Sequence, residues 1–357
     1  MKIIHCADLH LDSRMESVLP AEKAKERRME LLHTFIRMIE QAAENEVEAV
    51  LICGDLFDGA AVSSRAGNCV RDVISQHPQI MFYYLQGNHD SENFFDDAAR
   101  LPDNLRTFGS DWTCYEQGDL VITGVRLSGE HPEYMMRELS LDKNRINIVM
   151  LHGMITEYGA KNQTEEIPLR ELREKNIDYL ALGHLHSYRL EQLDERGMWC
   201  YCGCLEGRGF DECGRKGYVE LEISKGTVVP TFVPFAGREI HEIPVDITGL
   251  MTQEEIQKRV RLSVQEYPSK DLVKICLKGE MDPEAETDAV WIQKRLKEDF
   301  YFLKVKDETT LGIRPEDYQY DVSLKGEFVR LVLASDMTEK EKQEVLRRGI
   351  RALTGKG

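Results

Sequence analysis

The stretch LQGNHDS, residues 85–91, directly follows an apolar run at residues 80–85 that predicts a buried strand. Turn chemistry accounts for Gly87 and Asn88, because Gly and Asn are the residues that tight turns favour. It does not account for His89. The same arrangement, a buried strand followed at once by His or Asp, recurs at four other places in the chain, and together these places decide the fold.

The other four strands are predicted by the apolar runs KIIHCA, AVLICG, INIVMLHG and DYLALGH, at residues 2–7, 49–54, 146–153 and 178–184. Between the first two, apolar residues from Leu32 to Ala43 keep helical spacing. Strand–helix–strand repetition implies βαβ units with right-handed crossovers. We therefore expect an α/β fold in which a largely parallel sheet is covered by helices. Short runs at 197–203, 217–223 and 228–235 predict antiparallel strands and make the sheets mixed.

A composition break near Pro234 and Gly237 predicts a domain boundary. We expect one domain at residues 1–236 and a small α+β domain at residues 237–357. In the second domain, Thr252 followed three residues later by Glu255 predicts a capping box at the start of a helix. A length of 357 residues also favours two domains over one.

The composition is typical of a globular protein, with 42% hydrophobic and 31% charged residues. The first residues predict a strand without a charged and apolar leader, and no apolar run has the length of a membrane span. We therefore expect a cytoplasmic protein without a membrane partner. The net charge of −17 argues against the broad basic surface of a nucleic-acid binder, although a local patch and metal ions can still bind DNA.

The nine cysteines fit a reduced protein better than a disulfide framework. Cys6 and Cys53 lie in apolar strands, where a thiol acts as a small hydrophobe. A second group, at positions 200, 202, 204 and 213, raises the question of a zinc site. Its alternate spacing would point neighbouring thiols to opposite faces of a strand, so ordinary strand and loop cysteines are favoured over zinc.

Polar residues able to bind metal follow all five predicted parallel strands. Ligands of open α/β sheets bind at the carboxyl ends of the strands, so we expect these residues to converge. Each has an ordinary alternative, such as a helix cap for Asp or a turn for Asn, but five such coincidences in a row are improbable. The residues are Asp8 and His10, Asp55, Asn88 and His89, His152, and His184 and His186.

Oxygen and imidazole ligands without thiolate suit Mn, Fe, Zn or Mg. Seven candidate ligands are too many for one ion and suffice for two. A carboxylate such as Asp55 can bridge two ions about 3.5–4 Å apart, which clamp the oxygens of an in-line displacement at phosphorus. We therefore expect two divalent metal ions, with Mn as the first choice, and hydrolysis of a phosphoester.

The motifs D-x-H, G-D-x-x-D, G-N-H-D, H and G-H-x-H at these strand ends resemble those of the calcineurin-like metallophosphoesterase superfamily. The resemblance implies that one metal is held by Asp8, His10, Asp55 and His186, and the other by Asp55, Asn88, His152 and His184. It implies that His89 is no ligand but faces the scissile phosphate and protonates the leaving oxygen.

A narrower resemblance is to the bacterial SbcD-type DNA repair nucleases. It rests on HCADLHLDS at residues 5–13, on the motifs above and on YCGCLEGRGFDECGRKGYVELEI at residues 201–223. It implies a nuclease domain followed by a cap that shapes a DNA groove, a homodimer formed through helices, and an SbcC-type ATPase as partner. Archaeal and eukaryotic relatives carry His where this sequence has Asp58, so a second His at the phosphate is not expected.

Three functions remain open: a two-metal DNA phosphodiesterase, exonuclease or endonuclease, which we favour; a phosphoesterase acting on a small molecule or a phosphoprotein; and a scaffold without chemistry. Arg208, beside the metal motifs, is a candidate phosphate contact, with a solvated loop residue as the alternative. Residues 63–77 and 92–101 are candidate dimer helices. There Phe94 and Phe95 would be the apolar contacts, unless they pack on their own sheet.

Overall fold

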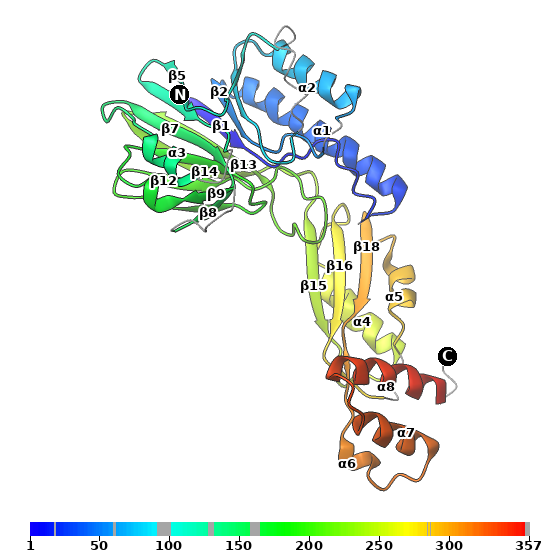
Figure 1. Cartoon of the computed structure of the whole chain (residues 1–357). Coiled ribbons are helices and arrows are strands. Elements are labelled where there is room, and N and C mark those ends of the chain that lie inside the picture. The colour runs from blue at the N-terminus through cyan, green and yellow to red at the C-terminus, as the bar shows by residue number, and fades with distance from the viewer. Residues whose placement is uncertain are drawn as a thin grey trace. The chain divides into compact units, whose positions relative to one another are not determined.

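The computed structural model describes the chain except residues 18, 60–61, 91–100, 128–131, 158–164, 284, 286 and 354–357. It divides into two compact units, Met1–Glu239 and Ile240–Gly357, which are described separately (Figure 1).

Two six-stranded mixed sheets form the first unit. One has the order β14-β13-β1-β2-β3-β4, in which β1 to β4 run parallel and β13 pairs antiparallel with both β1 and β14. Its strands are β1 (Lys2–Cys6), β2 (Ala49–Cys53), β3 (Met81–Leu85), β4 (Leu105–Thr107), β13 (Gly217–Ser224) and β14 (Thr227–Pro234).

The other sheet has the order β11-β12-β10-β7-β6-β5, with a parallel centre and an antiparallel strand at each edge. Its strands are β5 (Thr113–Gln117), β6 (Leu120–Gly124), β7 (Ile146–His152), β10 (Tyr179–Gly183), β11 (Arg189–Gln192) and β12 (Met198–Tyr201). The five strands expected in one sheet are thus divided between two: β1, β2 and β3 lie in the first, β7 and β10 in the second.

The main core of this unit lies between the two sheets. Ile3 and Leu51 from the first sheet, and Ile148 and Tyr179 from the second, belong to one buried apolar cluster. The helices α1 (Ala21–Glu44) and α2 (Ser64–Gln76) cover the outer side of the first sheet (Figure 1). A second apolar cluster lies beneath α3 (Pro132–Glu138), the short strands β8 (Met154–Thr156) and β9 (Glu166–Pro168), and a 3-10 turn (Leu169–Glu171). The first cluster therefore joins the two sheets face to face.

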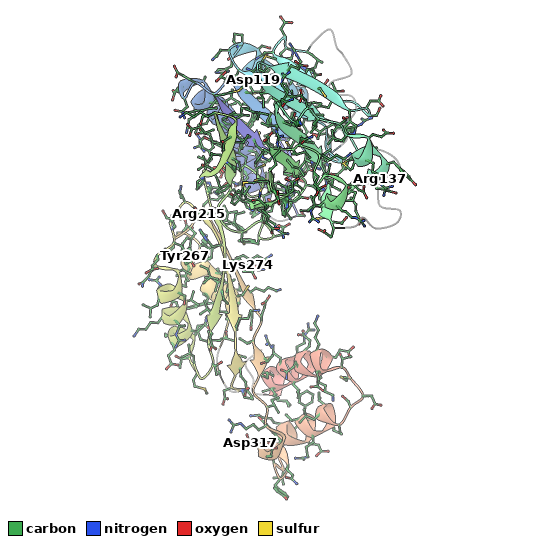
Figure 2. The ribbon with its side chains drawn as sticks, turned by 90° about the vertical axis from the view of Figure 1, so that its left-hand side faces the viewer. Asp119, Arg137, Arg215, Tyr267, Lys274 and Asp317 are labelled. Carbon is green, nitrogen blue, oxygen red and sulfur yellow. The ribbon has the colours of Figure 1, made fainter. Side chains whose placement is uncertain are left out.

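The second unit contains a three-stranded parallel sheet, β15 (Ile240–Asp246), β16 (Leu272–Lys278) and β18 (Phe302–Asp307). The helices α4 (Gln253–Val264) and α5 (Ala289–Leu296) pack on one face through Val273 and Ile275. The capping box of Thr252 and Glu255 is present. Lys274 extends from the other face (Figure 2).

The end of the second unit is a smaller helical layer with its own apolar cluster. It comprises β17 (Glu280–Met281), β19 (Thr310–Leu311), α6 (Pro315–Tyr318), α7 (Leu324–Leu333) and α8 (Glu339–Leu353). Among the helices in the described part of the chain, none combines the length and the apolar character needed to cross a lipid bilayer.

Candidate metal centre

The loops that follow β1, β2, β3, β7 and β10 bring the predicted ligands together at one edge of the first unit. Three groups of side chains have ligand atoms within 4.8 Å of one another. They are Asp8 with His10 and His186, Asp8 with Asp55 and His152, and His10 with Asp58 and His89. Residues from all five strand ends therefore form one cluster.

His152, the last residue of β7, is oriented by the backbone of the first sheet. Its Nδ1 donates a hydrogen bond to the carbonyl oxygen of Cys53 at 2.9 Å. Its Nε2 faces Oδ1 of Asn88 at 2.9 Å and Oδ2 of Asp55 at 3.5 Å. In metal-binding histidines, a hydrogen bond from the ring nitrogen that does not bind the metal fixes the tautomer and the ring orientation. Here the bond from Nδ1 directs Nε2 into the cluster.

The carboxylate of Asp55 lies between two imidazoles. Its Oδ2 is 3.7 Å from Nε2 of His10 and 3.5 Å from Nε2 of His152, while Oδ1 accepts a hydrogen bond from the backbone N–H of His89 at 2.9 Å. One oxygen thus faces ligand candidates on both sides, which is the position that a bridging carboxylate requires.

His10 and His186 face each other through Nε2 atoms that are 3.1 Å apart. Nδ1 of His186 donates to Oε1 of Glu212 at 2.7 Å, which leaves Nε2 with its lone pair. Within the described part of the chain, Nδ1 of His10 is buried without a hydrogen-bond partner. Metal–nitrogen bonds of about 2 Å place two imidazole ligands roughly 3 Å apart, so this donor set fits a divalent cation.

Asp8 and His184 complete the cluster from β1 and β10. Both carboxylate oxygens of Asp8 accept from the backbone N–H of His184, at 2.8 and 3.1 Å. The ring of His184 packs edge-on against that of His152, with centroids 5.5 Å apart. His184 belongs to none of the three ligand groups of described residues, although it adjoins the second one.

The electrostatics of the cluster favour a cation. Burial raises the pKa of Asp8 to about 6, partly offset by the charges of His152 and His186. Burial opposes the charged form of His152, but its contacts with Asp55 outweigh this and raise its pKa. Without metal, a proton on His152 therefore supplies positive charge beside the buried carboxylates of Asp8 and Asp55. A divalent cation would compensate the charge of these carboxylates more completely.

The backbone at the cluster is held in the left-handed region that most residues avoid. The φ angles of Asp8, His10 and Asp55 are 51°, 42° and 52°, and that of His184 is 107°. Such conformations cost of order 1–3 kcal/mol each and persist where the surrounding structure enforces them, often at active sites. Four of the seven predicted ligands carry this strain, as do six other described non-glycine residues.

Glycine provides space for the ligands at two positions. A Cβ on Gly54, which has φ of +85°, would lie 2.1 Å from Nδ1 of His152. A Cβ on Gly87 would lie 2.2 Å from Oδ1 of Asp55. The glycines of the G-D and G-N motifs therefore allow the close approach of ligands from neighbouring strands.

His89 lies at the exposed side of the cluster and pairs with Asp58. Its Nδ1 is 3.3 Å from Oδ1 of Asp58, and its side chain is 49% exposed. Asp58 also accepts a hydrogen bond from Oγ of Ser13 at 2.6 Å. The neighbouring His10 and this hydroxyl lower the pKa of Asp58, against an opposing effect of burial.

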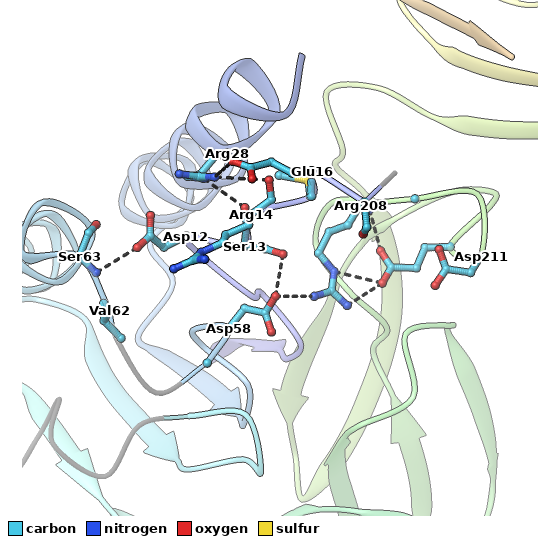
Figure 3. A pocket seen from close by; sticks show the side chains of 15 residues that line it. Asp12, Ser13, Arg14, Glu16, Arg28, Asp58, Val62, Ser63, Arg208 and Asp211 are labelled. Atoms are coloured by element: carbon cyan, nitrogen blue, oxygen red, sulfur yellow. Dashed lines mark hydrogen bonds and ion pairs between the residues drawn. The ribbon is translucent and has the colours of Figure 1, made fainter. Parts of the chain in front are cut away.

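Arg208 is held by carboxylates beside this pair. Its Nε and Nη2 donate to Oε1 of Glu212 at 3.1 and 2.8 Å, and its Nη1 lies 3.4 Å from Oδ2 of Asp58 (Figure 3). Burial alone would raise the pKa of Glu212. The contacts with His186 and Arg208 outweigh burial and lower this pKa to about 2. Glu212 and Asp58 thus connect a ligand candidate, His186, to His89 through one guanidinium.

A buried ion pair anchors the loop that carries Arg208 and Glu212. Arg27 on α1 is fully buried and donates through Nη2 to Oε2 of Glu206 at 2.9 Å and to the carbonyl oxygen of Gly207 at 2.6 Å. Oγ1 of Thr34 donates to Oε1 of Glu206. Sequence reasoning missed this anchor and the role of Glu212, because both join residues far apart in the chain and outside the strand-end motifs.

The cysteine cluster does not form a site with the described ligands. Cys200, Cys202 and Cys204 are buried and Cys213 is exposed. None of the three ligand groups found in the described part of the chain contains a cysteine. Burial raises the pKa of Cys200 to about 12, so this thiol stays protonated and acts as a core residue.

Residues 1–188 match the sequence model of the calcineurin-like phosphoesterases. The chain belongs to this family. The expected fold is thereby confirmed: two mixed sheets with outer helices form the α/β metallophosphoesterase fold, followed by an α+β region.

Two curated relatives of this calcineurin-like phosphoesterase are similar over much of the chain. The uncharacterized metallophosphoesterase YhaO of Bacillus subtilis is 27% identical over 243 residues, 64% of this chain and 59% of that protein. The DNA double-strand break repair protein Mre11 of Haloferax volcanii is 27% identical over 292 residues, 78% of this chain and 62% of that protein. The chain thus spans about three fifths of each relative. A solved structure, TT1561 of Thermus thermophilus, has 15% identity and a TM-score of 0.44, covering 65% of this chain and 98% of that one.

Proposed function

We propose that the protein is a two-metal phosphodiesterase of the SbcD type that hydrolyses DNA. One observation carries the hydrolytic part of this proposal. Oδ2 of Asp55 lies between Nε2 of His10 and Nε2 of His152, at 3.7 and 3.5 Å, as a carboxylate shared by two cations would.

The ligands in this proposal fall into two sets that share Asp55. Two divalent cations at this place, with Mn as the first choice, would neutralise charge on the phosphodiester and make water a stronger nucleophile at neutral pH. One set is Asp8, His10, Asp55 and His186, and the other is Asp55, Asn88, His152 and His184.

His89 is the general acid in this proposal. In the reacting form both ring nitrogens carry a proton: Nδ1–H faces Asp58, 3.3 Å away, and the proton on Nε2 passes to the leaving oxygen. The exposed ring of His89 remains accessible to a polymeric substrate. Its membership of the third ligand group supports a competing role as a metal ligand, which a metal analysis of a His89 variant distinguishes.

DNA is the proposed substrate because of the similarity to Mre11, which covers 78% of this chain and so extends beyond the first unit. We propose the first unit as the nuclease domain and the second as a DNA-binding cap. The helix-free face of its sheet carries Lys274, Lys304 and Lys306, where Lys274 and Lys304 are neighbours across two strands. Lys274 lies 2.7 Å from Glu242 and Lys306 lies 2.6 Å from Glu308. In this proposal a phosphate backbone would displace these carboxylates from the lysines, and such binding weakens steeply with salt.

The acidic balance of the chain supports a second candidate, a phosphoesterase acting on a small phosphoester or on a phosphoprotein. A net charge of −17 disfavours a polyanionic substrate at long range. A small ester needs only the metal centre.

The proposed partners follow from the SbcD-type resemblance: an SbcC-type ATPase and a second copy of the chain. Phe94 and Phe95, the expected dimer contacts, lie outside the described residues. The described exposed side of α2 carries polar residues such as Arg65, Asn68 and Asp72. Light scattering at high micromolar concentration tests the dimer, and a monomer there contradicts it.

Metal analysis combined with hydrolysis assays tests the proposed function. The purified protein is stripped of metal, reloaded with Mn, Mg, Zn or Fe, and assayed on single-stranded DNA, double-stranded DNA and a nitrophenyl phosphodiester. We expect two metal ions per chain and DNA cleavage. Ester hydrolysis without DNA cleavage would favour the small substrate, and bound metal without hydrolysis would favour a scaffold.

A further inference from the structure

A polar cavity of about 990 Å³ adjoins the metal centre in the first unit (Figure 3). Its wall is formed by the loop after β1, the loop between β2 and α2, the loop that carries Arg208, and Arg28 of α1. Asp58 belongs both to this wall and to the pair with His89. The cavity therefore begins where the general acid of the proposed reaction is held.

Two of the three arginines on the wall are already engaged. Arg208 binds Glu212 and lies 3.4 Å from Asp58. Arg28 donates through Nε to the carbonyl oxygen of Ser13 at 3.2 Å and through Nη2 to that of Arg14 at 3.3 Å. Arg28 thereby braces the loop after β1 against α1.

Arg14, the third arginine, is exposed and extends into the cavity (Figure 3). No hydrogen bond or ion pair of its guanidinium with another described side chain is found. The loop that carries it is fixed by Arg28, and also by Asp12, which accepts a hydrogen bond from the backbone N–H of Ser63 at 2.9 Å. The loop thus places a cation on the cavity wall without a partner among the described side chains.

Carboxylates of the wall leave this cation available. Asp58 is engaged by Ser13 and Arg208, and Glu212 by His186 and Arg208. Asp12 accepts from the backbone N–H of Ser63, and Glu16 lies 3.7 Å from Nη2 of Arg28. Asp211 lies at the opposite end of the cavity from Arg14 (Figure 3). An anion that enters beside Asp58 would therefore meet the guanidinium of Arg14.

We propose that this cavity binds the leaving-group side of a polynucleotide and that Arg14 contacts the phosphate adjacent to the scissile one. The inference rests on the proposed function and deepens it. In the proposed reaction His89 faces the leaving oxygen, and Asp58 belongs both to the pair with His89 and to the wall of the cavity, so we place the strand beyond the leaving group in this cavity. A guanidinium suits a phosphate because its planar fork donates two parallel hydrogen bonds.

The inference predicts a substrate preference that the metal centre alone does not give. The dinucleotide TpT has one phosphodiester and no neighbouring phosphate, whereas pentathymidylate has phosphates on both sides of its internal bonds. The wild-type protein should cleave pentathymidylate with a higher kcat/KM than TpT. A hydrogen bond to a charged group is worth about 1.5–3 kcal/mol, so Arg14→Ala should reduce this preference by about tenfold or more.

Variants at Arg14 and one matched control make the test specific. Arg14→Lys keeps the charge and should retain part of the preference, while Arg14→Glu should lose more than Arg14→Ala. Arg137→Ala removes an exposed arginine that pairs with Glu171 on the far side of the unit's second sheet, and should leave both rates unchanged. Thermal melting checks that every variant is folded.

Two outcomes overturn the inference, and they are distinguishable. If the wild type cleaves both oligonucleotides and Arg14→Ala loses the same factor on each, the cavity does not bind a neighbouring phosphate and the proposed function stands. If the wild type hydrolyses bis(4-nitrophenyl) phosphate but neither oligonucleotide, the proposed function and this inference fall together.

Discussion

Nδ1 of His186 donates a hydrogen bond to the buried carboxylate of Glu212 at 2.7 Å, across 26 positions of the sequence. A carboxylate in this position fixes the ring of a metal-binding histidine and raises its basicity. We predict that Glu212→Gln lowers the affinity of the His186 site for metal by about 10–100-fold, the usual effect of losing such a partner. Calorimetric titration of the stripped protein with Mn measures it, with Glu191→Gln on the surface as the control. Unchanged affinity would mean that Glu212 serves only Arg208.

Asp55→Asn and His89→Gln separate metal binding from proton transfer. Asp55→Asn removes the charge shared by both sets of ligands, so metal and activity should be lost together. His89→Gln should keep two metals while DNA cleavage falls by about 10²–10⁴-fold, the usual worth of a positioned acid. The loss should be smaller on a nitrophenyl diester, because nitrophenolate leaves without a proton. If His89→Gln loses metal, His89 is a ligand.

Gly54→Ala should displace His152, because the new Cβ would lie 2.1 Å from its Nδ1. Gly226→Ala is a matched control, since Gly226 also has positive φ, +79°, but open space around it. Both variants should lose about 1 kcal/mol of stability from backbone strain. Only Gly54→Ala should lose metal as well, as measured by elemental analysis. Equal metal content in the two variants would contradict the clearance argument.

His5 should weaken the fold as the pH falls. It is fully buried between Tyr179 and the carbonyl oxygen of Leu182, and burial lowers its pKa to about 3 despite that carbonyl. Because the unfolded state takes up the proton near pH 6.5, stability is complete above this pH and is lost as the pH falls toward 3. At pH 5 the loss from His5 is about 2 kcal/mol.

Urea unfolding of the stripped protein at pH 7.5 and pH 5.0 measures this loss. Between the two pH values, the free energy of unfolding should fall by about 2 kcal/mol less in His5→Gln than in the wild type. The other titrating groups are the same in both proteins. Equal differences would mean that His5 is protonated in the folded protein.

The strand ends could be predicted from the sequence because buried runs and the polar residues after them are local signals. Asp8, Asp55, Asn88 and His152 therefore meet in the structure as expected. The division into two sheets could not, because a buried parallel strand has the same apolar pattern whichever sheet it joins.

Contacts between segments that are far apart in the chain could not be predicted from the sequence either. The pairing of Arg27 with Glu206 joins a helix face to a loop 179 positions away, and a charged residue in a helix is ordinarily exposed. Arg208 was predicted as a phosphate contact from its neighbours in sequence. Its engagement by Glu212 depends on a turn that no periodicity indicates, and a phosphate contact by Arg208 stays a prediction.

The left-handed backbone at Asp8, His10, Asp55 and His184 limits how this centre can be re-engineered. Asn, Asp and His are the non-glycine residues that tolerate such conformations best, and they are also oxygen and nitrogen donors. A designer who wished to change the metal preference with a longer or branched donor would have to rebuild the main chain as well. Directed evolution of this protein by single substitutions can therefore use only a few residue types at these four positions.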